Sequence, residues 1–361
     1  MARHFSRPAL SKAGQIEIPF HWIFALVGGF LFLLFFFVLI RSVVTSNQQR
    51  DTADLTLSVQ TILLNALTKP GEFTVSDLQS ASYRFVCERD AAGMLSYVRI
   101  GQGSYDPSQL RYVPFFSPSV VEGDQLFTRT AVWKAPFPVS PVLLVSNNRT
   151  RYVFVGSAGS LPSIRSFIQG EGLDGFNTFV ASSSAMGAVK DEGLDQYRFV
   201  FFGGFADPGQ AFKNATALNV QLSADGTSGT LTFYDDLSCA GSCGVAPRAQ
   251  LTVPFVGTAM LDAAIFSQDS SAFRCGFAKM EERLNTSVTT LLGRLDDLSS
   301  PSTNVPQQCK ALYGQARQPL QDYETDPLGA FSSVGGNPSA AQQIQTIQRR
   351  LAAEGVCPGV Y

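Results

Sequence analysis

The longest hydrophobic pattern in the chain is an uncharged run near the N-terminus. Residues 19–40 contain no Asp, Glu, Lys or Arg. About 20 apolar residues in an α-helix, at a rise of about 1.5 Å each, span the ~30 Å hydrocarbon core of a bilayer. The pattern therefore predicts a transmembrane helix at residues 19–41, preceded by a short tail at residues 1–18.

The charges on the two sides of this span predict its orientation. Arg3, Arg7 and Lys12 precede it, and Arg41 stands almost alone after it. The positive-inside rule therefore places the N-terminus in the cytoplasm and the C-terminal domain outside the cytoplasm, on a single-pass protein of the cell membrane. A cleaved signal peptide has a shorter apolar region, of roughly 7–15 residues, followed by small residues. Because this run is longer and a charge follows it, we expect an uncleaved anchor.

A helical pattern continues beyond the span. Its apolar positions recur every three or four residues: Leu55, Val59, Ile62, Leu63 and Ala66. Since neither Pro nor Gly separates them from the span, we expect a helical stalk at residues 42–70. This stripe could pack on the protein's own domain, or it could pair with a second copy as a coiled coil and form a homo-oligomer.

Short β-branched and aromatic runs follow the stalk. Residues 83–87 and 95–100 flank a turn and predict a hairpin, and residues 126–133 predict another strand. Three prolines are expected to mark a break before the next section: Pro136, Pro138 and Pro141.

Strands and helices then alternate. We expect strands at 142–145, 152–155, 178–180 and 197–202, and helices at 162–169 and 183–189. Such Rossmann-like alternation is typical of an α/β unit with some parallel pairing. Residues 217–222 and 230–234 predict a further hairpin, and residues 251–255 one more strand. Together these segments predict a mixed sheet in an extracytoplasmic domain at residues 71–265.

The C-terminal segment, at residues 266–361, is helical in pattern. One long helix carries a regular apolar stripe: Phe273, Phe277, Met280, Leu284, Val288, Leu291 and Leu295. A second helix is expected near residues 307–316, and a third opens at residues 337–339. The predicted fold class is therefore α/β or α+β, with an N-terminal transmembrane helix and stalk and a helical C-terminal segment.

Composition excludes several functions. The formal net charge is −2, so the chain has no basic surface suited to nucleic acid. Both histidines, His4 and His21, lie before or within the span. A Ser-His-Asp hydrolase, a Cys-His protease and a histidine-ligated zinc enzyme each need an imidazole in the outer domain. We therefore predict no catalytic residue, no metal and no cofactor, although paired carboxylates or a Ser-Lys pair would not need histidine.

All six cysteines lie beyond the span: Cys87, Cys239, Cys243, Cys275, Cys309 and Cys357. An even number on an extracytoplasmic side predicts disulfides, and six cysteines allow 15 pairings. At least one pair could join the C-terminal helices. The CxxxC spacing of Cys239 and Cys243 is a poor match to a zinc site. Three sequons are glycosylation candidates on this side: Asn148, Asn214 and Asn285.

A turn rich in Gly and Ser is the candidate ligand site. Gly156, Ser157, Gly159 and Ser160 follow one predicted strand and precede a predicted helix. Backbone N–H groups and the helix dipole can bind an anion at such a place. The turn lacks the GxGxxG and GxxxxGK[ST] patterns, and an ordinary strand-to-helix turn capped by Ser160 explains the same residues.

Two acidic pairs offer further candidate chemistry. Asp191 with Glu192, and Asp235 with Asp236, could bind Ca²⁺, although no EF-hand spacing is present. Solvated loops are the favoured interpretation of both pairs. An envelope enzyme would require two such carboxylates within hydrogen-bond reach in one cleft.

Two resemblances bear on function. The KAG sequence at residues 12–14 resembles the cleavage region of archaeal prepilins, which implies a pilin-like filament subunit. More of the chain resembles a group of uncharacterised single-span membrane proteins of small-genome archaea: GQIEIPFHWIF at 14–24, FRCGFAK at 273–279 and CPGVY at 357–361. That group has no assigned activity. The resemblance implies an archaeal cell surface and a single C-terminal framework for Cys275, Cys309 and Cys357.

The sequence thus favours a non-catalytic structural or interaction protein, anchored in the lipid bilayer and exposed at the cell surface, with other surface proteins as partners. A ligand-binding domain using the Gly156–Ser160 turn and a filament subunit are the alternatives.

Overall fold

The computed structural model describes most of the 361-residue chain. The described residues are 17–90, 93–100, 103–105, 113–135, 137–208, 212, 214–223, 226, 228–237, 248–326, 329–331 and 339–358. They belong to two compact units, Met1–Asp54 and Leu55–Tyr361. The boundary between these two units falls inside the predicted stalk. The division into five parts that the sequence suggested stays a prediction.

One α-helix, α1 (Glu17–Leu67), contains both the predicted span and the predicted stalk. Its segment Trp22–Val44 has a mean hydropathy of 3.0, and none of the scored window is buried. It is the one helix in the described part of the chain that is long and apolar enough to cross a membrane. The prediction of an N-terminal apolar helix is confirmed.

In the described part of the chain, the first sheet has six strands. They are β1 (Phe73–Asp90), β2 (Gly93–Ile100), β3 (Gly103–Tyr105), β4 (Phe115–Phe116), β5 (Val120–Lys134) and β6 (Pro138–Asn147). Their order is β3-β2-β1-β5-β6-β4, antiparallel except between β4 and β6. The predicted hairpin is confirmed by the pairing of β1 with β2.

The break predicted from prolines falls between β5, which ends at Lys134, and β6, which begins at Pro138, but two of the prolines lie inside β6. Pro138 pairs with Lys134, and Pro141 pairs with Val132, within the β5–β6 hairpin. β4 reaches only Leu143 and Leu144 of β6, so both prolines lie where β6 is an edge strand among the described strands. An edge position tolerates proline because its missing N–H costs little there. Pro136 lies outside the described residues.

The second sheet also has six strands. They are β7 (Thr150–Gly156), β8 (Thr178–Ser182), β9 (Gln196–Phe202), β10 (Ala215–Leu222), β11 (Ser228–Tyr234) and β12 (Leu251–Val256), in the order β12-β11-β10-β9-β7-β8. The strands β8, β7 and β9 are parallel, as the alternating pattern predicted, and β10 also pairs with β9 in parallel. The strand that the same pattern predicted at residues 142–145 lies instead in β6 of the first sheet, antiparallel to β5. The helix α2 (Leu161–Gly170) and the 3₁₀ helix η2 (Ser183–Ala188) make the connections around β8.

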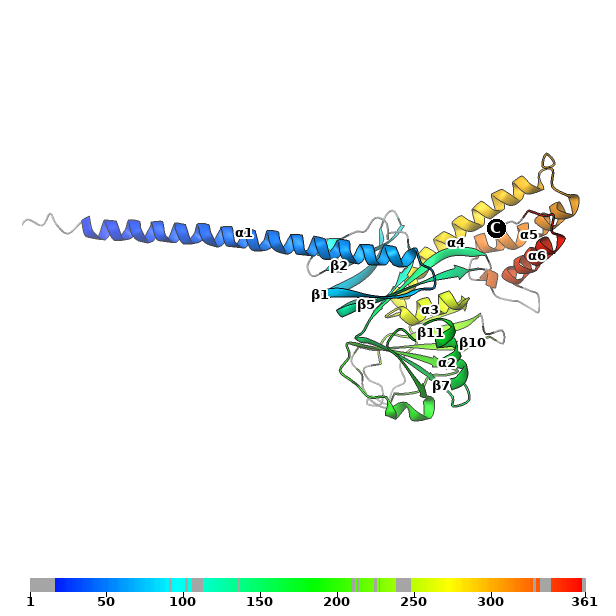
Figure 1. Cartoon of the computed structure of the whole chain (residues 1–361), viewed down its shortest axis with the longest axis horizontal. Helices are drawn as coiled ribbons and strands as arrows, with labels where there is room; N and C mark the ends of the chain where they lie inside the picture. The colour runs from blue at the N-terminus through cyan, green and yellow to red at the C-terminus, as the bar shows by residue number, and fades with distance from the viewer. Residues whose placement is uncertain are drawn as a thin grey trace, which may run out of the picture. The chain divides into compact units, whose positions relative to one another are not determined.

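The C-terminal helices are α3 (Thr258–Phe266), α4 (Ser270–Ser299), α5 (Gln307–Thr325), the 3₁₀ turn η3 (Gly329–Phe331) and α6 (Ala340–Glu354). All seven stripe residues predicted in the long helix are buried in α4. The helix α3 was not predicted, and it packs between the two sheets (Figure 1). Its side chains from Ala259 to Phe266 are buried on every side, and all of them except Asp262 are apolar, so the helix carries no periodic signal.

Alternation along the strands divides the interior into layers. On β6, Leu143 packs with Val59 and Leu63 of α1, whereas Leu144 faces the central core with α3. On β7, Phe154 faces the same central core from the second sheet, and Val153 faces a separate outer cluster. The α1 stripe beyond Asp54 is therefore buried on the protein's own first sheet.

Two disulfides join distant parts of the fold. Cys87 in β1 is bonded to Cys275 in α4, and Cys309 in α5 is bonded to Cys357 after α6, with Cα–Cα distances of 5.9 and 5.5 Å. The second bond confirms that a pair joins the C-terminal helices. The single C-terminal framework implied by the resemblance is wrong, because packing of α4 on the first sheet places Cys275 against β1. Cys239 and Cys243 lie outside the described residues.

A close approach of α4 to β4 explains one glycine. A Cβ at Gly276 would overlap the ring of Phe116, which is buried in the central core. Gly276→Ala is expected to destabilise the protein by about 1–3 kcal/mol, because a methyl group forces a packed ring to move. Urea unfolding of the full chain measures the effect. Gly293→Ala is the matched control in the same helix, where a Cβ meets nothing within 4 Å. A loss of stability at both positions would show that helix packing is not the cause.

Candidate functional site

A polar cleft of about 500 Å³ opens between the two sheets. Ser119, Val120 and Glu122 form one wall, at the start of β5. The other wall comes from the amino-terminal ends of the parallel strands β9 and β10, with Gln196 and Thr216. Residues after β11 and after α3 close the cleft. Five separate segments of the chain thus meet at one place.

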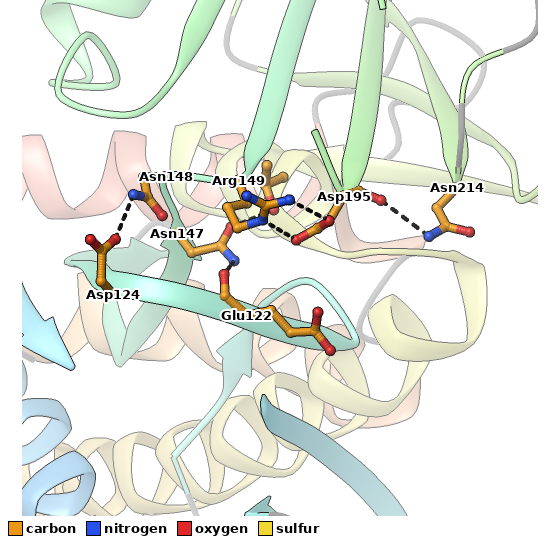
Figure 2. Close-up of polar contacts among 8 residues, drawn as sticks. Glu122, Asp124, Asn147, Asn148, Arg149, Asp195 and Asn214 are labelled. Atoms are coloured by element: carbon orange, nitrogen blue, oxygen red, sulfur yellow. Dashed lines mark hydrogen bonds and ion pairs between the residues drawn. The ribbon is translucent and has the colours of Figure 1, made fainter. Parts of the chain in front are cut away.

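Polar contacts gather beside this cleft at the β6–β7 connection, where the chain passes from the first sheet to the second. Figure 2 shows Arg149 forming a two-bonded ion pair with Asp195, which precedes β9. The Asn147 Nδ2 donates to the Glu122 backbone oxygen at 2.6 Å, and the Asn214 Nδ2 donates to the Asp195 backbone oxygen at 3.1 Å. The hydrogen bond and the charge of Asp195 raise the pKa of Arg149 above its ordinary value.

A buried guanidinium lies behind the cleft. Arg198 in β9 is 3% exposed, and its Nη1 donates to the Thr216 Oγ1 at 3.0 Å. Its Nη2 donates to the Ala264 backbone oxygen at 3.0 Å. Desolvation lowers the pKa of Arg198 to about 10, although the charges of Asp235 and Asp269 favour its protonated form. Arg198 therefore stiffens the cleft from behind and ties β10 to α3.

The carboxylates that line the cleft differ in their hydrogen bonds and ion pairs. Asp235 accepts hydrogen bonds from the backbone N and the Oγ of Ser270, at 2.8 and 2.6 Å, so it stabilises the N-terminus of α4. Asp195 is paired with Arg149. The exposed carboxylate of Glu122 has no hydrogen-bond partner among the described residues and points away from the Arg149 pair in Figure 2.

Gln196 is the second group with unused acceptor capacity. Its side chain is 7% exposed, and its Oε1 has no hydrogen-bond partner in the described part of the structure. Because side chains alternate along a strand, Gln196 lies on the same face of the second sheet as Arg198, the face from which Thr216 also lines the cleft. A buried acceptor without a partner costs stability unless a donor is supplied.

The lining residues define what the cleft can do chemically. The described lining residues include no Lys, Arg, Cys or His, so they offer no nucleophile paired with a histidine or lysine base. No group of three or more His, Cys, Asp or Glu side chains among the described residues is arranged to hold a metal ion. Acceptor oxygens predominate, and the cleft is suited to a ligand that donates hydrogen bonds.

The predicted ligand turn lies elsewhere in the fold. Gly156–Ser160 follows the carboxyl-terminal end of β7, whereas the cleft lies at the amino-terminal ends of β9 and β10. The Ser160 Oγ donates to the Ser157 backbone oxygen at 2.9 Å and makes no cap bond to α2. A Cβ at Gly156 would lie 2.5 Å from the Ile164 Cδ1. Space for a side chain is thus blocked at Gly156 but open at Gly159, and ligand binding at the turn stays a prediction.

The two acidic pairs singled out in the sequence lie at different places, one outside the cleft and one in its lining. Asp191 accepts from the Tyr197 hydroxyl at 2.9 Å, and Glu192 pairs with Arg151 at 2.6 Å, so that acidic pair makes structural contacts outside the cleft. Asp235 and Asp236 both line the cleft.

The three sequons also differ in their surroundings. The Asn148 Nδ2 donates to the Asp124 Oδ1 at 2.8 Å, beside the β6–β7 connection. Asn214 borders the cleft, and Asn285 lies on the exposed face of α4. Glycosylation at these positions stays a prediction.

Comparison with protein-family models, with curated proteins and with solved structures finds no match to this chain. The resemblance to archaeal surface proteins accordingly stays a prediction. The function must be argued from the geometry of the described residues.

Proposed function

We propose that this chain is a single-pass membrane protein whose large domain lies outside the cytoplasm and acts as a non-catalytic structural or interaction protein of the cell surface. One observation carries the proposal. The segment Trp22–Val44 presents 23 residues of mean hydropathy 3.0 with none of the scored window buried. An apolar surface of this length is stable in a bilayer and unfavourable in water.

Two further features support the proposal. The disulfides Cys87–Cys275 and Cys309–Cys357 are typical of an oxidising compartment. The domain after the span contains no histidine, which removes the commonest acid–base residue. Both features fit a stable surface domain that binds and does not catalyse.

The anchor and its orientation are tested by labelling in cells. Single cysteines are introduced at Ser6, in the tail, and at Arg283, on the exposed face of α4. A membrane-impermeant maleimide on intact cells is expected to label Arg283→Cys above the level of the wild-type chain. Ser6→Cys is expected to react only after the membrane is permeabilised, because the tail lies on the other side.

Intact mass of the membrane-extracted protein is the accompanying control. Retention of the full 39.0 kDa chain is expected for an uncleaved anchor. Loss of the N-terminal segment would identify a cleaved signal, and the reverse labelling pattern would place the domain in the cytoplasm. Either result contradicts the proposal.

A ligand-binding role is the second candidate, and the cleft between the sheets is the observation that favours it. The cleft contains unused acceptors in Glu122 and Gln196. The filament-subunit alternative has no comparable observation in the described residues.

A further inference from the structure

We propose that the cleft between the two sheets binds an organic cation, an ammonium or guanidinium group, through Glu122 and Gln196. This inference deepens the interaction role proposed above and rests on it. It names the chemistry that the partner or ligand must present.

The first step concerns hydrogen bonding. The Gln196 Oε1 is an acceptor on a side chain that is 7% exposed, and it has no partner among the described residues. Gln196 extends from the sheet face that lines the cleft. Groups of this kind are nearly always satisfied in folded proteins, so a donor entering the cleft would complete the site.

The second step concerns charge. Four carboxylates line the cleft, from Glu122, Asp195, Asp235 and Asp236, and the adjacent guanidinium groups are those of Arg149 and Arg198. Among the described residues these carboxylates outnumber the two guanidinium groups, and the Glu122 carboxylate interacts with Arg149 through its charge but accepts no hydrogen bond there. A cation is therefore attracted into the cleft, and an anion is repelled.

The third step distinguishes an organic cation from a metal ion. No arrangement of three or more candidate ligands for a metal occurs in the described residues. An ammonium group offers three N–H donors and a guanidinium five, so either can bond an amide oxygen and a carboxylate together. A volume of about 500 Å³ holds a small amine or the end of one basic side chain.

The test is calorimetric titration of the full chain, in a neutral detergent at low salt, with two probes: spermidine, which carries ammonium groups, and the blocked peptide acetyl-Gly-Arg-Gly-amide, whose one charge is a guanidinium. At least one probe is expected to bind, with an affinity that falls as salt is raised. Glu122→Gln and Gln196→Met are each expected to weaken binding by about tenfold. The first removes the negative charge that attracts the cation, and the second removes one hydrogen bond to a charged group.

Two controls separate binding from folding. Gln196→Met removes an unpartnered buried acceptor at similar volume, so its melting temperature should equal or exceed that of the wild type while its affinity falls. Glu282→Gln removes the same charge as Glu122→Gln, but from the exposed face of α4, away from the cleft lining, and its affinity should match the wild type.

The outcomes decide the inference in either direction. Binding of spermidine alone identifies a small amine, and binding of the peptide identifies a basic side chain of a partner; both support the site. The absence of binding by either probe, or equal binding by Glu122→Gln and Gln196→Met, overturns it. The titration does not depend on which side of a membrane the domain occupies, so its failure and a failure of the labelling experiment are separate results.

Discussion

Removal of the Cys87–Cys275 disulfide, by Cys87→Ser with Cys275→Ser, is expected to lower the free energy of unfolding by about 4–5 kcal/mol. The bond closes a loop between positions 188 residues apart and joins β1 of the first sheet to α4. Without it the unfolded chain gains conformational freedom, while the native contacts of α4 stay available. Urea unfolding of the full chain, followed by the fluorescence of the buried Trp133, measures the loss.

The second disulfide provides the control. Cys309 and Cys357 are 48 residues apart, so Cys309→Ser with Cys357→Ser should cost less, by about 1 kcal/mol, on the same loop-entropy argument. A larger loss for the shorter loop would show that local packing of α5 and α6 sets the stability, and the entropic account would then be rejected for this fold.

Local periodicity predicted the parts of the fold that alternate between core and solvent. The stripe from Phe273 to Leu295 repeats every three or four residues because one face of α4 packs on the core and the other faces solvent. The strands β7, β9 and β10 were predicted because their apolar runs are buried on both faces, and the helical segments between β7, β8 and β9 indicated parallel pairing. Each of these signals is contained in a short continuous stretch of sequence, which is why the sequence alone reveals it.

The features that escaped prediction depend on contacts between distant segments. The helix α3 is buried on all sides, so its composition differs little from that of a buried strand. The division of the twelve described strands into two sheets depends on which strands form hydrogen bonds with each other. The sequence of a single strand does not specify its partner. The ligand turn at Gly156–Ser160 was predicted from a local composition of Gly and Ser, which contains no information on contacts with distant segments.

The cleft, by contrast, has no local motif. Gln196 lies just before the strand predicted at residues 197–202, and Glu122 lies before the strand predicted at residues 126–133. The two residues meet only because β5 and β9 begin at the same place between the sheets. The six cysteines predicted disulfides, but the partner of Cys275 depended on how α4 packs.

Asp262→Asn is expected to remove a pH dependence of stability that the wild-type protein shows between about pH 5 and pH 8. Asp262 in α3 is fully buried, and its Oδ2 lies 3.1 Å from the Arg129 Nη1. The Arg129 Nη2 lies 3.6 Å from the Glu171 Oε2, so one guanidinium serves two carboxyl groups. The Asp262 Oδ1 has no hydrogen-bond partner in the described structure.

The sign of this pH dependence of stability follows from the pKa of Asp262. Burial, together with the charge of Glu171, raises the pKa of Asp262 from 3.8 to about 8, although Arg129 acts to lower it. Between these two values the unfolded chain has released the proton and the folded chain retains it. Stability is therefore greatest below the unfolded pKa and falls as the pH rises towards the folded pKa, by up to about 1.4 kcal/mol per pH unit. Over about pH 5 to pH 8 the loss from this one group is roughly 3 kcal/mol.

Urea unfolding at a series of pH values measures this dependence. The amide of the Asp262→Asn variant would keep an oxygen for Arg129 and could not ionise, so the variant should gain stability relative to the wild type from pH 5 to pH 8, and the difference should then level off. Asp297→Asn, on the exposed face of α4, removes a carboxylate without burial and should leave the pH dependence unchanged. If Asp262→Asn retained the wild-type slope, the buried carboxyl would not be its source, and the Arg129 charge would be balanced in the core by an ionised Asp262 throughout this range.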